Sequence, residues 1–85
     1  MAAKAPVVLV VDDEPETRRY VGMNLKVRGY EVLTAADGTE ALRLAQEHPV
    51  DLVLLDILMP GMDGFQVCQR LRQMSAVPII MLSAR

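Results

Sequence analysis

Short apolar runs alternate along the chain with segments whose apolar positions recur every three or four residues. Residues 7–11 hold only valine and leucine, which is typical of a strand that is covered on both faces. Residues 30–35 alternate apolar and polar side chains more strongly, and residues 50–55 and 77–82 are again mainly apolar. The pattern predicts strands over these four ranges.

The segments between the strands have helical spacing and helix-end signals. Pro15 suits the first turn of a helix, and Gly29 is typical of a residue that ends one. Asp37 and Glu40 have the spacing of a helix N-cap pair. The pattern predicts three helices, over residues 15–28, 38–47 and 65–74.

This order of elements indicates a fold class. Strands that alternate with helices of about ten to fifteen residues favour right-handed crossovers between parallel strands. We therefore expect an α/β doubly wound parallel sheet with helices on both faces. Ligands of such sheets bind beyond the carboxyl ends of the strands, so the residues that follow each strand are the candidates for function.

The composition limits the class of protein. The 85 residues are 52% hydrophobic and 24% charged, with a formal net charge of −2. These values fit one small globular domain, and they offer no basic surface for direct binding of nucleic acid or anionic lipid.

Targeting and redox signals are also weak. No apolar run is long enough to span a bilayer, and residues 1–6 lack the apolar stretch of a signal peptide. The single cysteine, Cys68, cannot form an internal disulfide and is expected to pack inertly on a helix face. We therefore expect a cytoplasmic protein without a membrane anchor.

Carboxylates follow two of the predicted strands. Asp12 and Asp13 come directly after the first strand, and Asp56 comes after the third. If these strands share one parallel sheet, the three acids meet at the same edge, where their mutual repulsion favours a bound cation. Hard oxygen ligands with room left for water suit Mg²⁺. Taken alone, Asp12 or Asp13 is equally typical of a helix N-cap.

Asp56 is the expected phosphoryl acceptor, because it lies at the middle of the acidic edge beside a glycine-rich loop. A carboxylate accepts a phosphoryl group when a metal and nearby donors neutralise the transferred oxygens. Ser83 ends the fourth strand, and its hydroxyl and the backbone N–H of Ala84 are candidate donors to those oxygens. Taken alone, Ser83 is also typical of a polar strand end.

The loop over residues 59–64 is expected to shape the site and not to supply chemistry. Pro60 fixes φ, and Gly61 and Gly64 permit positive φ. Three other polar side chains are expected to be solvated and to have no catalytic role: Arg18, Arg19 and His48.

Three segments resemble the receiver domain of two-component response regulators. They are VLVVDDEP, LVLLDILMPGMDG and PIIMLSAR, and they span most of the chain in this order. The resemblance implies a flavodoxin-like sheet with strand order 2-1-3-4. It also implies that Asp56 accepts a phosphoryl group from a phosphohistidine of a sensor histidine kinase or phosphotransfer protein. The chain would then catalyse its own phosphorylation and would not be a conventional enzyme.

The resemblance further implies roles for single residues. Asp13, Asp56 and the backbone carbonyl of Leu58 would ligate Mg²⁺, and Asp12 would contact the ion mainly through water. Ser83 matches the switch hydroxyl of the family.

The family pattern is longer than this chain. A complete receiver continues through a further helix, a fifth strand with a buried lysine, and a last helix. We therefore expect residues 1–85 to form one truncated receiver domain, βαβαβαβ, that lacks these elements. The fourth strand would be an apolar edge beside an uncovered sheet face, and we expect self-association, as a dimer, through both.

Two functions stay open from the sequence. The first is a phosphoacceptor signalling domain, and the second is a catalytically impaired half-domain that acts as a structural or self-associating module, which the missing lysine favours. A flavin or nucleotide domain fits poorly, because the first loop is acidic where a phosphate requires glycine and backbone N–H groups. A phosphatase or hydrolase with an Asp nucleophile lacks an evident acid/base residue.

Overall fold

The computed structural model describes residues 4–57, 59, 61 and 63–82. These residues form four strands and three helices in strict alternation. The strands are β1 (Val7–Val11), β2 (Glu31–Ala35), β3 (Leu52–Asp56) and β4 (Ile79–Leu82), and the helices are α1 (Pro15–Val27), α2 (Gly38–Glu47) and α3 (Gly64–Met74).

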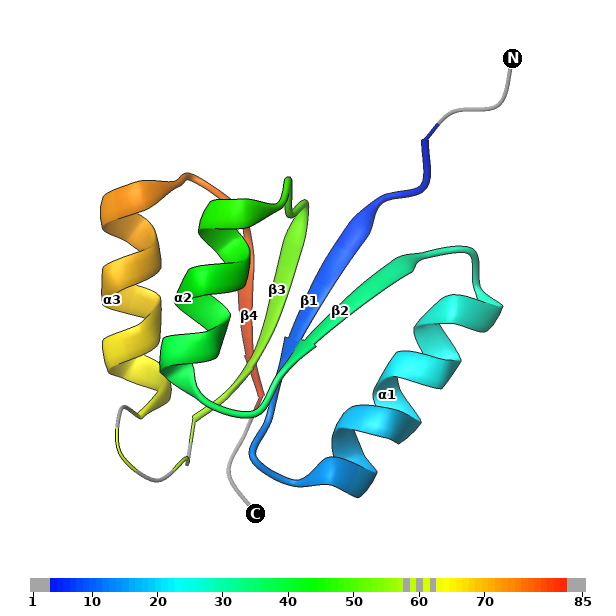
Figure 1. Cartoon of the computed structure of the whole chain (residues 1–85), viewed down its shortest axis with the longest axis horizontal. Helices are drawn as coiled ribbons and strands as arrows, with labels where there is room; N and C mark the ends of the chain where they lie inside the picture. Colours follow the sequence, from blue (N-terminus) through cyan, green and yellow to red (C-terminus); the bar gives the residue numbers. More distant parts are fainter. Residues whose placement is uncertain (1–3, 58, 60, 62, 83–85) are drawn as a thin grey trace.

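The strands form one parallel sheet with the order β2-β1-β3-β4. Helix α1 covers one face of the sheet, and α2 and α3 lie side by side on the other face (Figure 1). This is a doubly wound arrangement, and the predicted fold class is confirmed. Among the described residues, no helix is both long and apolar enough to cross a membrane.

Two strands begin two residues later than the apolar pattern predicts. β4 begins at Ile79 because Pro78 has no N–H to pair, and the N–H of Val77 donates to the Ser75 hydroxyl at 3.1 Å. β3 begins at Leu52. Before it, the backbone N–H of Asp51 donates to the carbonyl of Val7 at 2.8 Å, and the Asp51 carboxylate accepts from the N–H of Val7 at 2.7 Å.

The main core lies between the sheet and the pair α2 and α3. Side chains of a strand alternate between the two faces, and the set that faces this pair is almost wholly buried. Val67 and Leu71 of α3 and Ala41 of α2 close the core from the helix side. The strand side consists mainly of Leu9, Val11, Val53 and Leu55.

On the opposite face, burial falls from the centre of the sheet towards β4. Val10, Leu54 and Ile80 are register partners and form one row across the sheet. Val10 is 1% exposed, Leu54 is half-buried, and Ile80 is 49% exposed. Helix α1 packs on β1 and β2, so its cover ends before this row reaches β4.

The predicted N-cap pair of α2 is confirmed. The Asp37 carboxylate accepts from the N–H of Glu40 at 2.8 Å, and the Glu40 carboxylate accepts from the N–H of Ala36 at 2.8 Å. The pair satisfies the N–H of Glu40, which the helix leaves without an acceptor, and the N–H of Ala36 just before the cap.

Candidate functional site

The carboxylates of Asp12, Asp13 and Asp56 meet at the carboxyl edge of the sheet. Each contributes an oxygen, and these oxygens all lie within 4.8 Å of one another. Residues separated by more than forty positions in the sequence are thereby brought to one point, as the ends of the apolar runs predict.

The register of the sheet produces this cluster. β1 and β3 are direct neighbours, and Val11 pairs with Leu55. Asp12 follows Val11 and Asp56 follows Leu55, so parallel pairing puts the two acids side by side at the end of the ladder. Asp13 follows Asp12 in the turn that leads to α1.

Two of the three carboxylates are withdrawn from water. Asp12 is 5% exposed and Asp56 is 4% exposed, whereas Asp13 is half-buried. Carboxylates this close in a buried setting repel one another, because water screens their charges poorly there. Such repulsion is reduced when positive charge lies nearby.

The helix-cap alternative for these acids does not hold. The N-cap residue of α1 is Glu14, and no side chain caps that helix end. The Asp12 carboxylate accepts from the N–H of Glu14 at 2.9 Å, which is a local turn of the kind that Asp commonly forms. This contact orients the Asp12 carboxylate at the edge of the sheet.

Arg18 is a positioning residue that the sequence did not reveal. We expected a solvated side chain, but Arg18 is half-buried and its guanidinium donates to the backbone carbonyl of Asp12 at 2.7 Å. The spacing of six residues places Arg18 in α1 above the turn that holds the acids. Arg19 and His48 are exposed, as predicted.

At the start of α3, Gly64 is held closely against Asp56 and Ile57. The N–H of Gly64 donates to the carbonyl of Ile57 at 2.9 Å, and Met59 is buried. Gly61 has φ 77°, as predicted, but Gly64 does not have positive φ. Gly64 is required for a different reason, because a Cβ there would lie 2.5 Å from the carbonyl oxygen of Asp56.

Asp63, in the loop between β3 and α3, has a structural role that we did not expect from the sequence. Asp63 caps α3: its carboxylate accepts from the N–H of Gln66 at 3.0 Å, and the Gln66 side chain accepts from the N–H of Asp63 at 3.2 Å. The reciprocal pair fixes where α3 starts relative to β3. The spacing of Asp and Gln three residues apart is the signal that could have identified it.

The three carboxylates fit a magnesium ion in donor type and in spacing. Mg²⁺ prefers oxygen ligands at about 2.1 Å, so two ligands on opposite sides of the ion are about 4.2 Å apart. The observed limit of 4.8 Å between the oxygens is close to this value. Small side-chain movements, or one contact through water, would complete the match.

Four residues with expected roles lie outside the described residues. They are Leu58, Pro60, Ser83 and Ala84.

The chain is similar over most of its length to known proteins. The family model described as "Response regulator receiver domain" matches residues 8–85. The "Probable transcriptional regulator ycf27" of Cyanophora paradoxa is 58% identical over 78 residues, which are 91% of this chain and 32% of that protein. The chain spans about a third of the length of the curated relatives it matches.

Solved structures agree with the sequence comparison. The chemotaxis protein CheY4 of Vibrio cholerae is 41% identical with a TM-score of 0.93, and the match covers 96% of this chain and 71% of that one.

A second structural neighbour is the response regulator protein TrrA of Thermotoga maritima. In its structure with Mg²⁺ and BeF it is 42% identical, with a TM-score of 0.89 over 94% of this chain and 70% of that one. It is also solved in complex with the histidine kinase ThkA, where the TM-score is 0.87 over 93% of this chain and 69% of that one.

The sheet order, the acidic edge and these matches lead to the same assignment. The chain belongs to the response regulator receiver domain family of two-component signalling.

Proposed function

We propose that this chain is a phosphoacceptor module in which Asp56 receives a phosphoryl group from a phosphohistidine. The observation that carries the proposal is the spacing of the acidic cluster, whose three carboxylate oxygens lie within 4.8 Å of one another. Phosphoryl transfer depends mainly on positioning and on charge stabilisation. In this proposal the cluster positions the acceptor carboxylate and holds the ion that stabilises charge.

The chemistry follows from the position of Asp56. A carboxylate oxygen of Asp56 attacks the phosphorus atom, the new O–P bond forms, and the P–N bond to the imidazole breaks. The imidazole leaves with the electrons of that bond and takes a proton from solvent. The backbone of Asp56 is fixed by its strand and by the Gly64 contact, which limits the freedom of the attacking carboxylate before the reaction.

Asp12, Asp13 and Asp56 would hold Mg²⁺ in this proposal, as the spacing and the oxygen donors favour. The ion would neutralise charge on the transferred phosphoryl oxygens. Arg18 acts indirectly, because its bond to the Asp12 carbonyl steadies the turn that carries two of the three acids.

Further donors belong to the proposal. Leu82 pairs with Asp56 in the sheet, and Ser83 and Ala84 follow Leu82 in the sequence. We assign the Ser83 hydroxyl and the Ala84 N–H to the phosphoryl oxygens, and the Leu58 carbonyl to the metal. Comparison of Ser83→Ala with the parent chain tests the hydroxyl: the rate of phosphorylation falls, and Mg²⁺ affinity stays unchanged.

The proposed donor is a sensor histidine kinase or a phosphotransfer protein. The complex of TrrA with the kinase ThkA supports this class of partner. The negative net charge of the chain supports a protein donor over a nucleic acid partner.

Incubation with acetyl phosphate and Mg²⁺, followed by intact mass measurement, tests the phosphoacceptor role. We expect one added phosphoryl group, its loss on removal of Mg²⁺, and its loss in Asp56→Asn. The matched control is Asp51→Asn, because Asp51 lies at the opposite end of the same strand region. Phosphorylation of the Asp56→Asn variant to the same extent as the parent would refute the assignment.

A second proposed role is self-association through β4 and the face beside it. The supporting observation is the row from Val10 to Ile80, along which exposure rises to 49%. β4 is an outer strand of the described sheet, and apolar outer strands favour pairing with another copy.

Sedimentation velocity over a range of micromolar concentrations tests this second role. We expect a dimer in the parent chain and a monomer in Ile80→Asp. The control is Val27→Asp, because Val27 is 86% exposed on α1, away from the proposed interface. A parent chain that is folded and monomeric throughout would contradict the role.

A further inference from the structure

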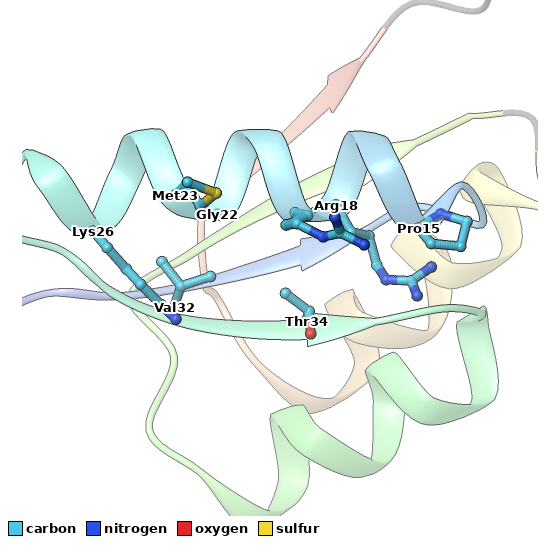
Figure 2. Close-up of a pocket in the computed structure, with 8 residues that line it drawn as sticks. Pro15, Arg18, Gly22, Met23, Lys26, Val32 and Thr34 are labelled. Carbon is cyan, nitrogen blue, oxygen red and sulfur yellow. The ribbon is translucent and has the colours of Figure 1, made fainter.

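A groove runs between helix α1 and strand β2, on the side of the molecule away from α2 and α3 (Figure 2). Its volume is about 360 Å³, which is within the usual range of small-ligand sites. We name it the α1–β2 groove, and it is lined by Pro15, Arg18, Arg19, Gly22, Met23, Lys26, Val32 and Thr34.

The lining is strongly cationic although the chain as a whole is acidic. It holds three basic residues and no acidic one, whereas the whole chain has nine basic and eleven acidic residues. Arg43 forms ion pairs with Glu40 and Glu47 on α2. Neither of these two ion pairs involves a basic residue of the groove.

The cations are arranged along the groove and not at a single point. Arg18, Gly22 and Lys26 are four residues apart in α1 and share one face of the helix. Eight residues of helix correspond to about 12 Å, so positive charge is available at both ends. In Figure 2, Lys26 reaches from α1 towards Val32 on β2, and Arg18 and Pro15 lie at the other end.

Helix and strand approach each other closely at the middle of the groove. Gly22 is buried, and a Cβ at this position would be 3.5 Å from Cγ1 of Val32. At this point α1 lies close to β2, and the two cationic ends lie on either side of this contact. Thr34 is exposed on β2 and offers a hydroxyl donor along the same wall.

We propose that the α1–β2 groove binds a small linear polyanion that carries at least two phosphate groups. Arginine recognises phosphate through a planar fork of donors, and lysine adds a compact charge. No residue of the lining is aromatic, so recognition rests on the charged groups and not on stacking with a base. The groove is separate from the acidic cluster, and Arg18 touches both, through its bond to the Asp12 carbonyl.

Titration of the chain with inorganic tripolyphosphate, without Mg²⁺, tests the proposal. We expect saturable binding by calorimetry and amide chemical-shift changes that concentrate at Met23, Val32 and Thr34. Lys26→Glu and Arg19→Glu should each weaken binding by about tenfold, as reversal of one nearby charge predicts. Both residues are exposed, so neither change threatens the fold.

The matched control is Arg28→Glu. Arg28 is exposed, follows the same helix and does not line the groove. Equal weakening by Arg28→Glu, or shift changes scattered over the surface, would show a non-specific charge effect and overturn the proposal. Retained binding in Asp56→Asn would support a site that is independent of the phosphoacceptor role, and its loss would overturn that independence.

Discussion

Gly64, the first residue of α3, lies directly against the backbone of Asp56, the last residue of β3. A Cβ at Gly64 would meet the Asp56 carbonyl oxygen at 2.5 Å and Cα of Ile57 at 2.7 Å, distances that no side chain tolerates without a backbone shift. The start of the helix can therefore lie this close to the proposed phosphoacceptor only because Gly64 has no side chain.

Gly64→Ala tests this contact. We expect the free energy of unfolding to fall by about 1–3 kcal/mol, because the added methyl overpacks against backbone that cannot yield. Urea denaturation measures the loss. Gly22→Ala is the comparison: its Cβ would make an ordinary contact at 3.5 Å, so the better helix propensity of alanine should raise stability by up to about 1 kcal/mol. A Gly64→Ala variant as stable as the parent would contradict the close approach.

Asp13→Asn separates repulsion from metal binding. Removing one of three clustered carboxylates should stabilise the chain in the absence of divalent ions. A ligand that binds only the folded state stabilises by about 2.7 kcal/mol at roughly 100 times its dissociation constant, and the variant should lose most of this gain with Mg²⁺. Thermal unfolding with and without Mg²⁺ measures both effects. An unchanged response to Mg²⁺ in Asp13→Asn would exclude Asp13 as a ligand.

Asp63→Ala removes the cap of α3. Loss of an N-cap carboxylate costs about 1 kcal/mol of stability, and here it should also reduce stabilisation by Mg²⁺, because the loop from Asp56 to α3 loses its fixed end. Asp37→Ala removes the equivalent cap of α2, which is not part of the connection from Asp56 to α3. We expect a similar loss of stability in both variants, measured by urea denaturation, with a reduced Mg²⁺ response in Asp63→Ala alone.

Asp51→Ala tests the opposite edge of the sheet. Its carboxylate accepts from the N–H of Val7, so the change should cost about 0.5–1.5 kcal/mol, the usual net worth of one hydrogen bond. Asp51→Asn keeps an acceptor oxygen and should cost less. Chemical denaturation compares the two variants. Equal losses in the two variants would show that the charge of Asp51, which both variants remove, matters and that a neutral acceptor oxygen does not replace it.

The strand order and the acidic edge could be expected from the sequence for a simple reason. A buried parallel strand is an apolar run, and the polar residue that ends it must lie at the sheet edge. Asp12, Asp13 and Asp56 each end such a run, so their meeting required only that β1 and β3 be neighbours. The family resemblance supplied that neighbour relation.

The contacts of Arg18 and Gly64 could not be derived in this way. The bond from Arg18 to the Asp12 carbonyl depends on how α1 sits on the sheet, and an arginine near a helix start has no pattern that distinguishes a bonded side chain from a solvated one. A glycine in a turn-rich loop is expected to adopt positive φ, as Gly61 does. Close approach, as at Gly64, becomes evident only when two segments are placed together in space.

The central position of β1 has a further consequence for the stability of the acidic cluster during local opening of the sheet. β1 is paired on both sides and all five of its residues are buried, so its amides should be the slowest in the sheet to exchange with solvent. Outer strands can fray and reclose while β1 stays intact. The adjacent acids at its end therefore remain anchored through such excursions, and the proposed ion site does not have to form again after each one.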